Sequence, residues 1–264
     1  MPLPKFTACV ALIALLVVNC AAAVLAADPD PQQILAPTGR LRAGLYPGTP
    51  TSILPNPEAE PRGVGYELGK ELAHRLGVPY EPVVFSKNAE VLAAVKSGSV
   101  DVAFTNASPS RAQDMDFGPA YLEIELGYLV PKASTIAALS DIDVPGRHIG
   151  VTEGSTSDAT LSRDLKQAAI VRAATVTIAI EMLSAGKMDA FATNKATLFE
   201  MSEKLPESKV LDGRWGVEHH AIAIPKGREL GLPFVRKFTE EVKREGLITA
   251  AVVRAGLRGA IAAQ

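Results

Sequence analysis

The chain contains almost no cysteine. Its 264 residues include only Cys9 and Cys20, and both lie in an apolar N-terminal stretch that we expect to be removed. The remaining chain then has no cysteine, which excludes disulfide bonds, cysteine-ligated zinc and cysteine nucleophiles. The stability of the fold must therefore come from a hydrophobic core, and a chain of this length can bury a sizeable one.

The chain also lacks an excess of charge of either sign. It has 27 Lys and Arg against 29 Asp and Glu, and its basic residues are scattered, so no basic patch indicates a nucleic-acid partner. The sequence has no phosphate-binding loop, no Gly-x-Ser-x-Gly elbow and no His-Glu-x-x-His motif. We therefore expect no nucleic acid, no metal and no other cofactor.

Residues 1–26 have the pattern of a secretory signal peptide. A basic residue is followed by a nearly continuous apolar run over residues 8–18, and residues 24–26 form a plausible cleavage box. No later segment is long and apolar enough to span a bilayer. We therefore expect an exported protein located in the periplasm.

The region around the expected cleavage site carries two further predictions. Lipid anchoring at Cys20 is disfavoured, because Asn19 stands where a lipoprotein signal requires a small residue. Residues 27–37 are rich in Pro and Asp and lack any periodicity, so we expect a linker there.

Two nine-residue segments resemble each other closely. Residues 98–106 read GSVDVAFTN, and residues 186–194 read GKMDAFATN. Each follows a helical pattern that ends at the glycine, and each then forms a short apolar run that ends in Thr-Asn. In open α/β sheets, ligands bind beyond the carboxyl ends of the strands. The repeat therefore predicts two similar α/β lobes that present polar strand ends to a shared cleft.

Strand and helix patterns alternate along the rest of the chain, which predicts an α/β fold with parallel sheets covered by helices. Two strand-like runs, at residues 124–131 and 221–224, are expected to cross between the lobes. Further strands are expected at residues 41–46, 82–85, 148–152 and 170–171, and helices around residues 68–76, 90–97, 178–185 and 234–255.

Two segments are suited to binding an anion. Arg111 follows the first Thr-Asn pair, and a guanidinium can hold a carboxylate through two parallel hydrogen bonds, although a surface salt bridge is an alternative. In the second lobe, Ser155 and Asp158 fit a helix capping box, and the same turn leaves backbone N–H groups that suit an anion. Together the two segments predict an anion clamp with one part on each lobe.

Other polar residues carry weaker interpretations. His219 and His220 are adjacent, so on a strand they face opposite sides and cannot share a metal; a hinge or surface role is expected. Asp101 and Asp189 stand at strand starts, away from the cleft, and are expected to accept hydrogen bonds from turn N–H groups. Lys195 is a candidate catalytic base, but a lysine after a strand end is expected to be solvated.

Several motifs, in a fixed order over residues 38–250, resemble those of the family 3 bacterial solute-binding proteins, which serve amino-acid-type ABC importers. This resemblance implies a monomeric, two-lobed periplasmic binding protein of type II, the Venus flytrap, with an ABC permease as partner. It implies a lobe 1 of residues 38–122 and 221–264 and a lobe 2 of residues 123–220. The motifs are GYEL at 65–68, RLG at 75–77, VDV at 100–102, SPSR at 108–111, MDFGPAY at 115–121, GVTEGST at 150–156 and LSAGKMDA at 183–190.

The resemblance also implies ligand-binding residues. Arg111 matches the arginine that holds the ligand carboxylate, and Thr156, beside Ser155, matches the residue that meets this carboxylate from lobe 2. Asn106 lies where the family has a small hydroxyl residue beside the ligand.

Three positions depart from the family pattern. Asn194 replaces the acidic residue that pairs with the α-ammonium group, and Thr49 and Asn88 replace two aromatic residues that sandwich the ligand. A charge-assisted hydrogen bond is about twice as strong as a neutral one, so the loss of the acid matters. We therefore expect a carboxylate-bearing or other small polar anion as ligand rather than a standard α-amino acid.

The sequence favours a binding protein without catalysis that closes its lobes on a small-molecule ligand. Two alternatives stay open. One is a periplasmic enzyme derived from this fold, similar to cyclohexadienyl dehydratase, and the other is a soluble accessory or sensor-partner protein.

Overall fold

The computed structural model describes residues 30–262, so the expected signal peptide and both cysteines lie outside the described residues. Helices and strands alternate along this part of the chain, as the sequence predicts. The helices are α1 (Pro31–Leu35), α2 (Val64–Leu76), α3 (Asn88–Ser97), α4 (Thr156–Asp164), α5 (Val176–Ser184), α6 (Lys195–Lys204), α7 (Leu232–Arg244) and α8 (Leu247–Arg254). The strands are β1 (Leu41–Leu45), β2 (Tyr80–Val84), β3 (Val102–Asn106), β4 (Met115–Pro131), β5 (His148–Thr152), β6 (Ala169–Ala173), β7 (Ala190–Asn194), β8 (Ser208–Val210), β9 (Gly216–Pro225) and β10 (Ala260–Ala262). Short 3-10 turns are η1 (Arg111–Gln113), η2 (Leu139–Asp141) and η3 (Glu229–Gly231).

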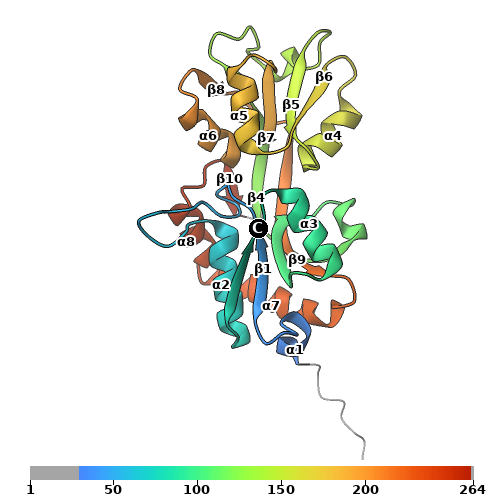
Figure 1. The fold of residues 1–264 in the computed structure, drawn as a ribbon, viewed down its shortest axis with the longest axis vertical. Coiled ribbons are helices and arrows are strands. Elements are labelled where there is room, and N and C mark those ends of the chain that lie inside the picture. Colours follow the sequence, from blue (N-terminus) through green and yellow to red (C-terminus); the bar gives the residue numbers. More distant parts are fainter. Residues whose placement is uncertain (1–29, 263–264) are drawn as a thin grey trace, which may run out of the picture.

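One sheet runs through two lobes (Figure 1). Its strand order is β2-β1-β3-β9-β4-β7-β5-β6, with β8 and β10 paired to β4. The pairs β1–β2, β1–β3, β5–β6 and β5–β7 are parallel, whereas β9 is antiparallel to β3 and to β4. We call the part with β1 to β3, α1 to α3, α7 and α8 lobe 1, and the part with β5 to β8 and α4 to α6 lobe 2. This arrangement confirms the predicted two-lobed α/β fold class.

The two crossing strands are longer than expected. β4 has 17 residues and β9 has 10, and both extend from lobe 1 into lobe 2 (Figure 1). Residues 115–123 carry no strand signal in the sequence, because Gly118 and Pro119 interrupt the apolar pattern. The strand accommodates them by register shifts against β9 between Phe117 and Leu122. The expected lobe boundaries after residues 122 and 220 fall inside these strands and stay predictions.

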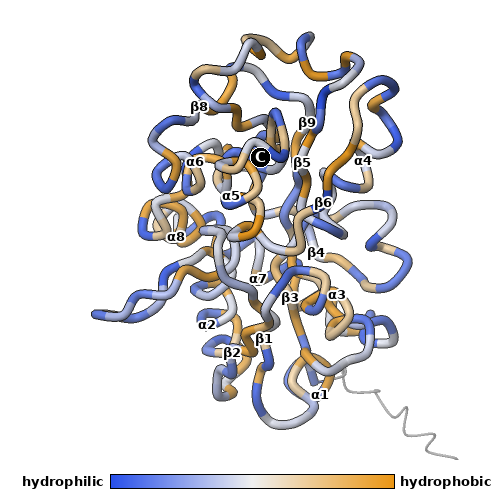
Figure 2. The backbone as a smooth tube through the Cα atoms, turned by 45° about the horizontal axis from the view of Figure 1, so that its top comes forward, coloured by the Kyte–Doolittle hydropathy of each residue, from blue (hydrophilic) through white to orange (hydrophobic). Residues whose placement is uncertain are grey.

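Each lobe has its own hydrophobic core. In lobe 1, Leu68 and Leu72 of α2 and Phe238 and Val242 of α7 are buried in one cluster, as their helical spacing predicts. Burying one such side chain stabilises the fold by about 1.5–3 kcal/mol. Separate clusters lie under the helices of lobe 2. In Figure 2 the strands β1 and β3 are hydrophobic, whereas the outer loops of both lobes are hydrophilic.

The nine-residue repeat has the same structure in both lobes. Gly98 and Gly186 follow α3 and α5 with φ of 71° and 67°, a left-handed conformation that glycine adopts without strain. Asp101 accepts a hydrogen bond from the backbone N–H of Arg42 (2.9 Å), and Asp189 accepts one from that of His148 (2.7 Å). Both aspartates thus fix the start of a neighbouring strand, far from the polar strand ends.

The expected linker contains a short helix. Asp30 accepts a hydrogen bond from the backbone N–H of Gln32 (3.0 Å), Pro31 occupies the first turn, and Leu35 is fully buried against lobe 1. The sequence does not predict this helix, because a capping residue and one buried leucine suffice to anchor a single turn without any periodic pattern.

Candidate functional site

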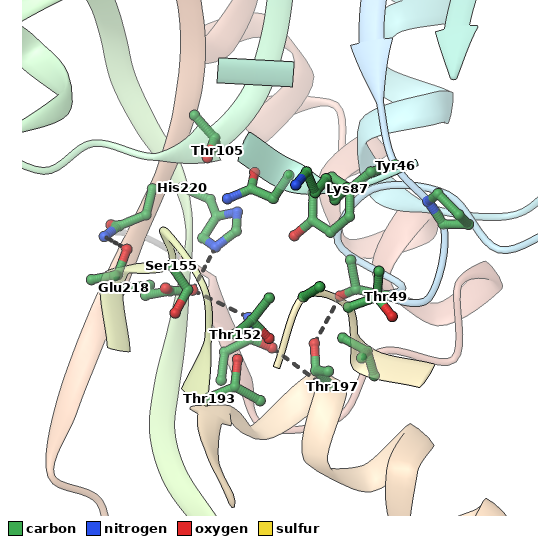
Figure 3. Close-up of a pocket in the computed structure, with 18 of the residues that line it drawn as sticks. Tyr46, Thr49, Lys87, Thr105, Thr152, Ser155, Thr193, Thr197, Glu218 and His220 are labelled. Carbon is green, nitrogen blue, oxygen red and sulfur yellow. Dashed lines mark hydrogen bonds and ion pairs between the residues drawn. The ribbon is translucent and has the colours of Figure 1, made fainter. Parts of the chain in front are cut away.

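A cavity of about 60 Å³ lies between the lobes, at the polar ends of β3 and β7 (Figure 3). Ten of the 20 residues that line it carry a hydroxyl group, so the cavity offers many hydrogen-bonding groups. Strand ends, helix starts and β9 all contribute to its wall. The structure brings all seven predicted ligand-binding residues to this wall: Thr49, Asn88, Asn106, Arg111, Ser155, Thr156 and Asn194.

Arg111 lies in η1, just after β3, and its guanidinium faces the cavity. Its Nη1 donates to the Thr105 hydroxyl (2.7 Å) and to the carbonyl of Asn106 (3.3 Å), both neutral groups. No carboxylate among residues 30–262 forms a salt bridge with it, which contradicts the alternative of a surface ion pair. Burial lowers the pKa of Arg111, and the nearby charge of Glu218 opposes this shift. The guanidinium remains charged and is able to bind an anion.

The start of α4 faces Arg111 from lobe 2. Ser155 caps the helix, with its hydroxyl accepting from the backbone N–H of Asp158 (3.1 Å), as the capping box predicts. The Asp158 carboxylate accepts from Gly154 N–H (3.1 Å) rather than from the cap residue itself, so the box is shifted by one residue. Thr156, the first helical residue, lies in the turn whose N–H groups have no intrahelical acceptor.

Two side-chain hydrogen bonds join the lobes across the cavity. Asn106 Nδ2 donates to the Thr156 hydroxyl (3.0 Å), and the Thr197 hydroxyl donates to that of Thr49 (2.9 Å). The Oδ1 of Asn106 also accepts from the backbone N–H of His219 in β9 (2.8 Å). The structure is therefore a closed arrangement of the lobes.

Asn194 uses both ends of its amide within the protein. Its Oδ1 caps α6 by accepting from Thr197 N–H (3.0 Å), and its Nδ2 donates to Glu218 Oε2 (3.2 Å). A flipped amide would place its nitrogen against an N–H donor and its oxygen against a carboxylate, so these partners fix its orientation. Asn194 thus lines the cavity as predicted, but its polar atoms hold the helix and an acidic neighbour.

Glu218 and His220 are wall residues that the sequence interpretation missed. Both are buried in β9, and His220 Nε2 lies 3.0 Å from Glu218 Oε2 (Figure 3). Burial raises the pKa of Glu218, but the hydrogen bond and charge of His220, the charge of Arg111 and the Asn194 amide together lower it below its ordinary value. The cavity therefore contains an ionised carboxylate, which corrects the expectation that it has no acidic group.

The expected hinge or surface role holds for only one of the two histidines. His219 is half exposed and contacts Glu123 (3.3 Å), whereas His220 points into the cavity. Residues on a strand alternate between its two faces, so Glu218 and His220 share one face and His219 lies on the other. An expected strand extended from Ala221 back to Gly216 would have placed both residues on one face, but it would not have shown that this face lines the cavity.

Tyr46 is another missed wall residue. It directly follows β1, and its hydroxyl points toward the centre of the cavity in Figure 3. Burial and the charge of Glu218 raise the pKa of Tyr46 to about 12, so the phenol stays protonated at neutral pH. Thr49 and Asn88 line the cavity at the two positions where the family pattern has aromatic residues, and Tyr46 supplies one aromatic ring to the wall.

Lys195 is directed away from the cavity. It is the first residue of α6, and its Nζ forms an ion pair with Glu125 (2.7 Å). It is neither solvated, as expected, nor among the residues that line the cavity.

No group of three metal-ligating side chains occurs within residues 30–262. In the same range, every helix is too short or too polar to cross a bilayer.

The chain is similar in sequence to a known protein family. Residues 41–254 match the model of the bacterial extracellular solute-binding proteins, family 3. The chain belongs to this family. It is 22% identical to the ABC transporter glutamine-binding protein GlnH of Bacillus subtilis over 198 residues, which cover 73% of this chain and 72% of that protein.

Solved structures agree with the family 3 assignment. The solute receptor for L-cysteine of Neisseria gonorrhoeae matches with a TM-score of 0.77 and 25% identity, covering 86% of this chain and 93% of that chain. A stretch of 115 residues is also 34% identical to the membrane-bound lytic murein transglycosylase F of Vibrio cholerae, but it spans only 20% of that enzyme.

Proposed function

We propose that this family 3 protein is the periplasmic solute receptor of an ABC importer. It binds a small, polar, carboxylate-bearing solute between its lobes, carries out no reaction on it, and presents the closed form to a membrane permease. In this proposal the protein works as a monomer. Its relatives include proteins named for binding glutamine and cysteine.

The observation that carries this proposal is the guanidinium of Arg111. A cation that is partly withdrawn from water normally has an anionic partner, because the loss of hydration would otherwise be uncompensated. Arg111 bonds only neutral groups within the described chain and lies opposite the N-terminal turn of α4. A carboxylate between these two segments satisfies both, and it ties lobe 1 to lobe 2.

Lobe closure follows from the position of the ligand groups. Thr49, Asn106 and Arg111 belong to lobe 1, whereas Thr156 and Asn194 belong to lobe 2, so a ligand that touches both sets favours the closed state. The bonds between Asn106 and Thr156 and between Thr49 and Thr197 are made in the same state.

The balance of charge in the cavity favours an anionic or zwitterionic solute. Its wall has two cationic side chains, Arg111 and Lys87, and one carboxylate, Glu218. The sequence hypothesis that α-amino acids are poor ligands was based on the neutral Asn194 and on the missing aromatic residues at Thr49 and Asn88. Because Glu218 supplies a carboxylate beside Asn194 and Tyr46 supplies an aromatic ring, the proposal includes amino carboxylates.

The enzyme alternative loses the one candidate base that the sequence offered for it. Lys195, the candidate base, is bonded to Glu125 outside it. Nor does any observation favour an accessory or sensor role over import.

Thermal unfolding with a library of carboxylates tests this proposal, and native mass spectrometry of the purified protein identifies any solute bound during expression. A ligand present at 100 times its Kd stabilises the folded state by about 2.7 kcal/mol. We expect at least one carboxylate to raise the Tm of the wild type and Arg111→Ala to abolish that shift.

Arg40→Ala is the matched control, because Arg40 is an exposed arginine paired with Glu81 and lies away from the cavity. It should keep the full shift. An Arg111→Ala variant that retains the shift, or a wild type that responds to no carboxylate, contradicts the proposal.

A further inference from the structure

One buried polar atom in the cavity has no partner within the described chain. His220 is only 5% exposed, and its Nδ1 has no hydrogen-bond partner in residues 30–262. Only five buried side-chain atoms of this range are unpartnered, and a second one, Thr152 Oγ1, lines the same cavity from lobe 2. Because buried polar atoms are nearly always hydrogen-bonded, these two wall atoms are available to a molecule bound in the cavity.

The partner of the other ring nitrogen, Nε2, determines which nitrogen of His220 carries the proton. Nε2 lies 3.0 Å from Glu218 Oε2, and an ionised carboxylate only accepts hydrogen bonds. Nε2 therefore carries a proton, and in the neutral form of the ring this leaves a lone pair on Nδ1. Asn194 Nδ2 donates to the same Glu218 oxygen and helps hold the carboxylate in place (3.2 Å).

Of the described residues, Glu218 is the one carboxylate on the cavity wall, so it is the group there that can hold the proton of His220 on Nε2. Besides His220, the titratable or charged side chains of the cavity wall are the carboxylate of Glu218, the cations of Arg111 and Lys87, and the phenol of Tyr46. The strand neighbours of His220, Asn106 on β3 and Leu122 on β4, are uncharged.

We propose that His220 meets the bound solute as a neutral imidazole whose Nδ1 accepts a hydrogen bond from it, and that Glu218 is the positioning residue that holds the ring in the required tautomer. The solute then carries a hydrogen-bond donor, an ammonium or a hydroxyl group, in addition to its carboxylate. This inference rests on the proposed function. It makes His220 and Glu218 of β9, rather than Asn194, the residues that select one carboxylate solute over another.

Matched sets of carboxylates test the inference by calorimetry. Each set has one carbon skeleton with an ammonium, a hydroxyl or no donor beside the carboxylate, for example alanine, lactate and propionate, or aspartate, malate and succinate. The library includes all twenty amino acids with their counterparts. In the set that binds most tightly, we expect a donor-bearing member to bind at least about tenfold more tightly than the donor-free one. Comparison of amine with hydroxyl identifies the donor.

His220→Gln separates recognition from folding. A glutamine amide still reaches Glu218 but has no atom in the place of Nδ1, so the variant should fold and lose the preference for donors. His219→Gln is the control on the opposite face of the same strand, and its preference should be unchanged. Nitrogen-15 NMR of the histidines should show the Nε2–H tautomer for His220 in the wild type and a mixture in Glu218→Gln.

The outcomes distinguish this inference from the proposed function. Equal affinity for donor-free and donor-bearing members, or an unchanged preference in His220→Gln, overturns the inference and leaves the carboxylate receptor intact. If no carboxylate in the library binds, both fail.

Discussion

The two copies of the nine-residue repeat each end their strand with an asparagine, and the two asparagines have different hydrogen-bond partners. In β3, Asn106 accepts from a backbone N–H and donates to the Thr156 hydroxyl of the opposite lobe. In β7, Asn194 accepts from a backbone N–H and donates to the buried carboxylate of Glu218. The backbone contact belongs to the fold, whereas the second contact belongs to the site. The difference shows that the partner, not the residue type, decides which role a repeated asparagine takes.

The aspartates of the repeat differ in burial rather than in role. The Asp101 side chain is fully buried and bonded to Arg42 and Arg228, whereas that of Asp189 is 34% exposed, with Arg147 at 3.5 Å. The ion pairs of Asp101 in lobe 1 thus stabilise the fold more than the ion pair of Asp189 does in lobe 2.

Removing these aspartates should produce the largest contrast. Asp101→Ala leaves two arginines without their anion and should lower the free energy of unfolding by about 3–5 kcal/mol. Asp189→Ala loses one backbone hydrogen bond at a partly exposed site and should cost about 1 kcal/mol. Urea unfolding of both variants measures the difference, and equal losses would refute the comparison.

Exchanging each asparagine for aspartate should reveal the difference between the strand ends. Asn194→Asp keeps the cap of α6 but sets a second carboxylate against Glu218, and we expect a loss of about 1–3 kcal/mol. Asn106→Asp faces a threonine hydroxyl, which can reverse its bond and donate, so stability should change little. The new charge beside Arg111 should instead weaken carboxylate binding. Chemical unfolding together with calorimetry tests both effects, and a stable Asn194→Asp would argue against an ionised Glu218.

The acid side of the stability profile should depend on Glu218. Because the pKa of Glu218 lies lower in the folded protein than its ordinary 4.5, the ionised group stabilises the fold above this pH. That contribution is lost as the pH falls through the folded pKa. The stability difference between wild type and Glu218→Gln should therefore shrink on acidification below pH 4.5. A difference that stays constant down to pH 3 would contradict this assignment.

The bonds between the lobes should give the smallest effect. Thr197→Val removes the hydroxyl that donates to Thr49 and should disfavour the closed state by about 1 kcal/mol. Small-angle scattering of the ligand-free protein should show a larger radius of gyration. Thr193→Val, on the cavity wall but without a bond between the lobes in the described chain, is the control and should leave the radius unchanged.

Periodicity and glycine stops predict most of the fold, because they report local structure and burial. The stripe of Leu68 and Leu72, the glycines that end α3 and α5, and the repeated aspartates are all found as expected. The strand over residues 115–123 could not be predicted, since register shifts against β9 rather than local preference accommodate its Gly-Pro pair.

The site was predicted where residues follow strand ends and missed where they lie within a crossing strand. Arg111 and Thr156 stand in turns with recognisable chemistry. Glu218 and His220 acquire their place only because β9 pairs with β3 and β4 along the cavity, and long-range pairing leaves no local signal in the sequence.

A crystal structure with the bound solute tests the account most directly. It should show the solute carboxylate hydrogen-bonded to the Arg111 guanidinium and to the N-terminal turn of α4, with a donor group of the solute on His220 Nδ1. A solute whose carboxylate lies away from Arg111, with Glu218 and His220 facing an empty wall, would contradict the account.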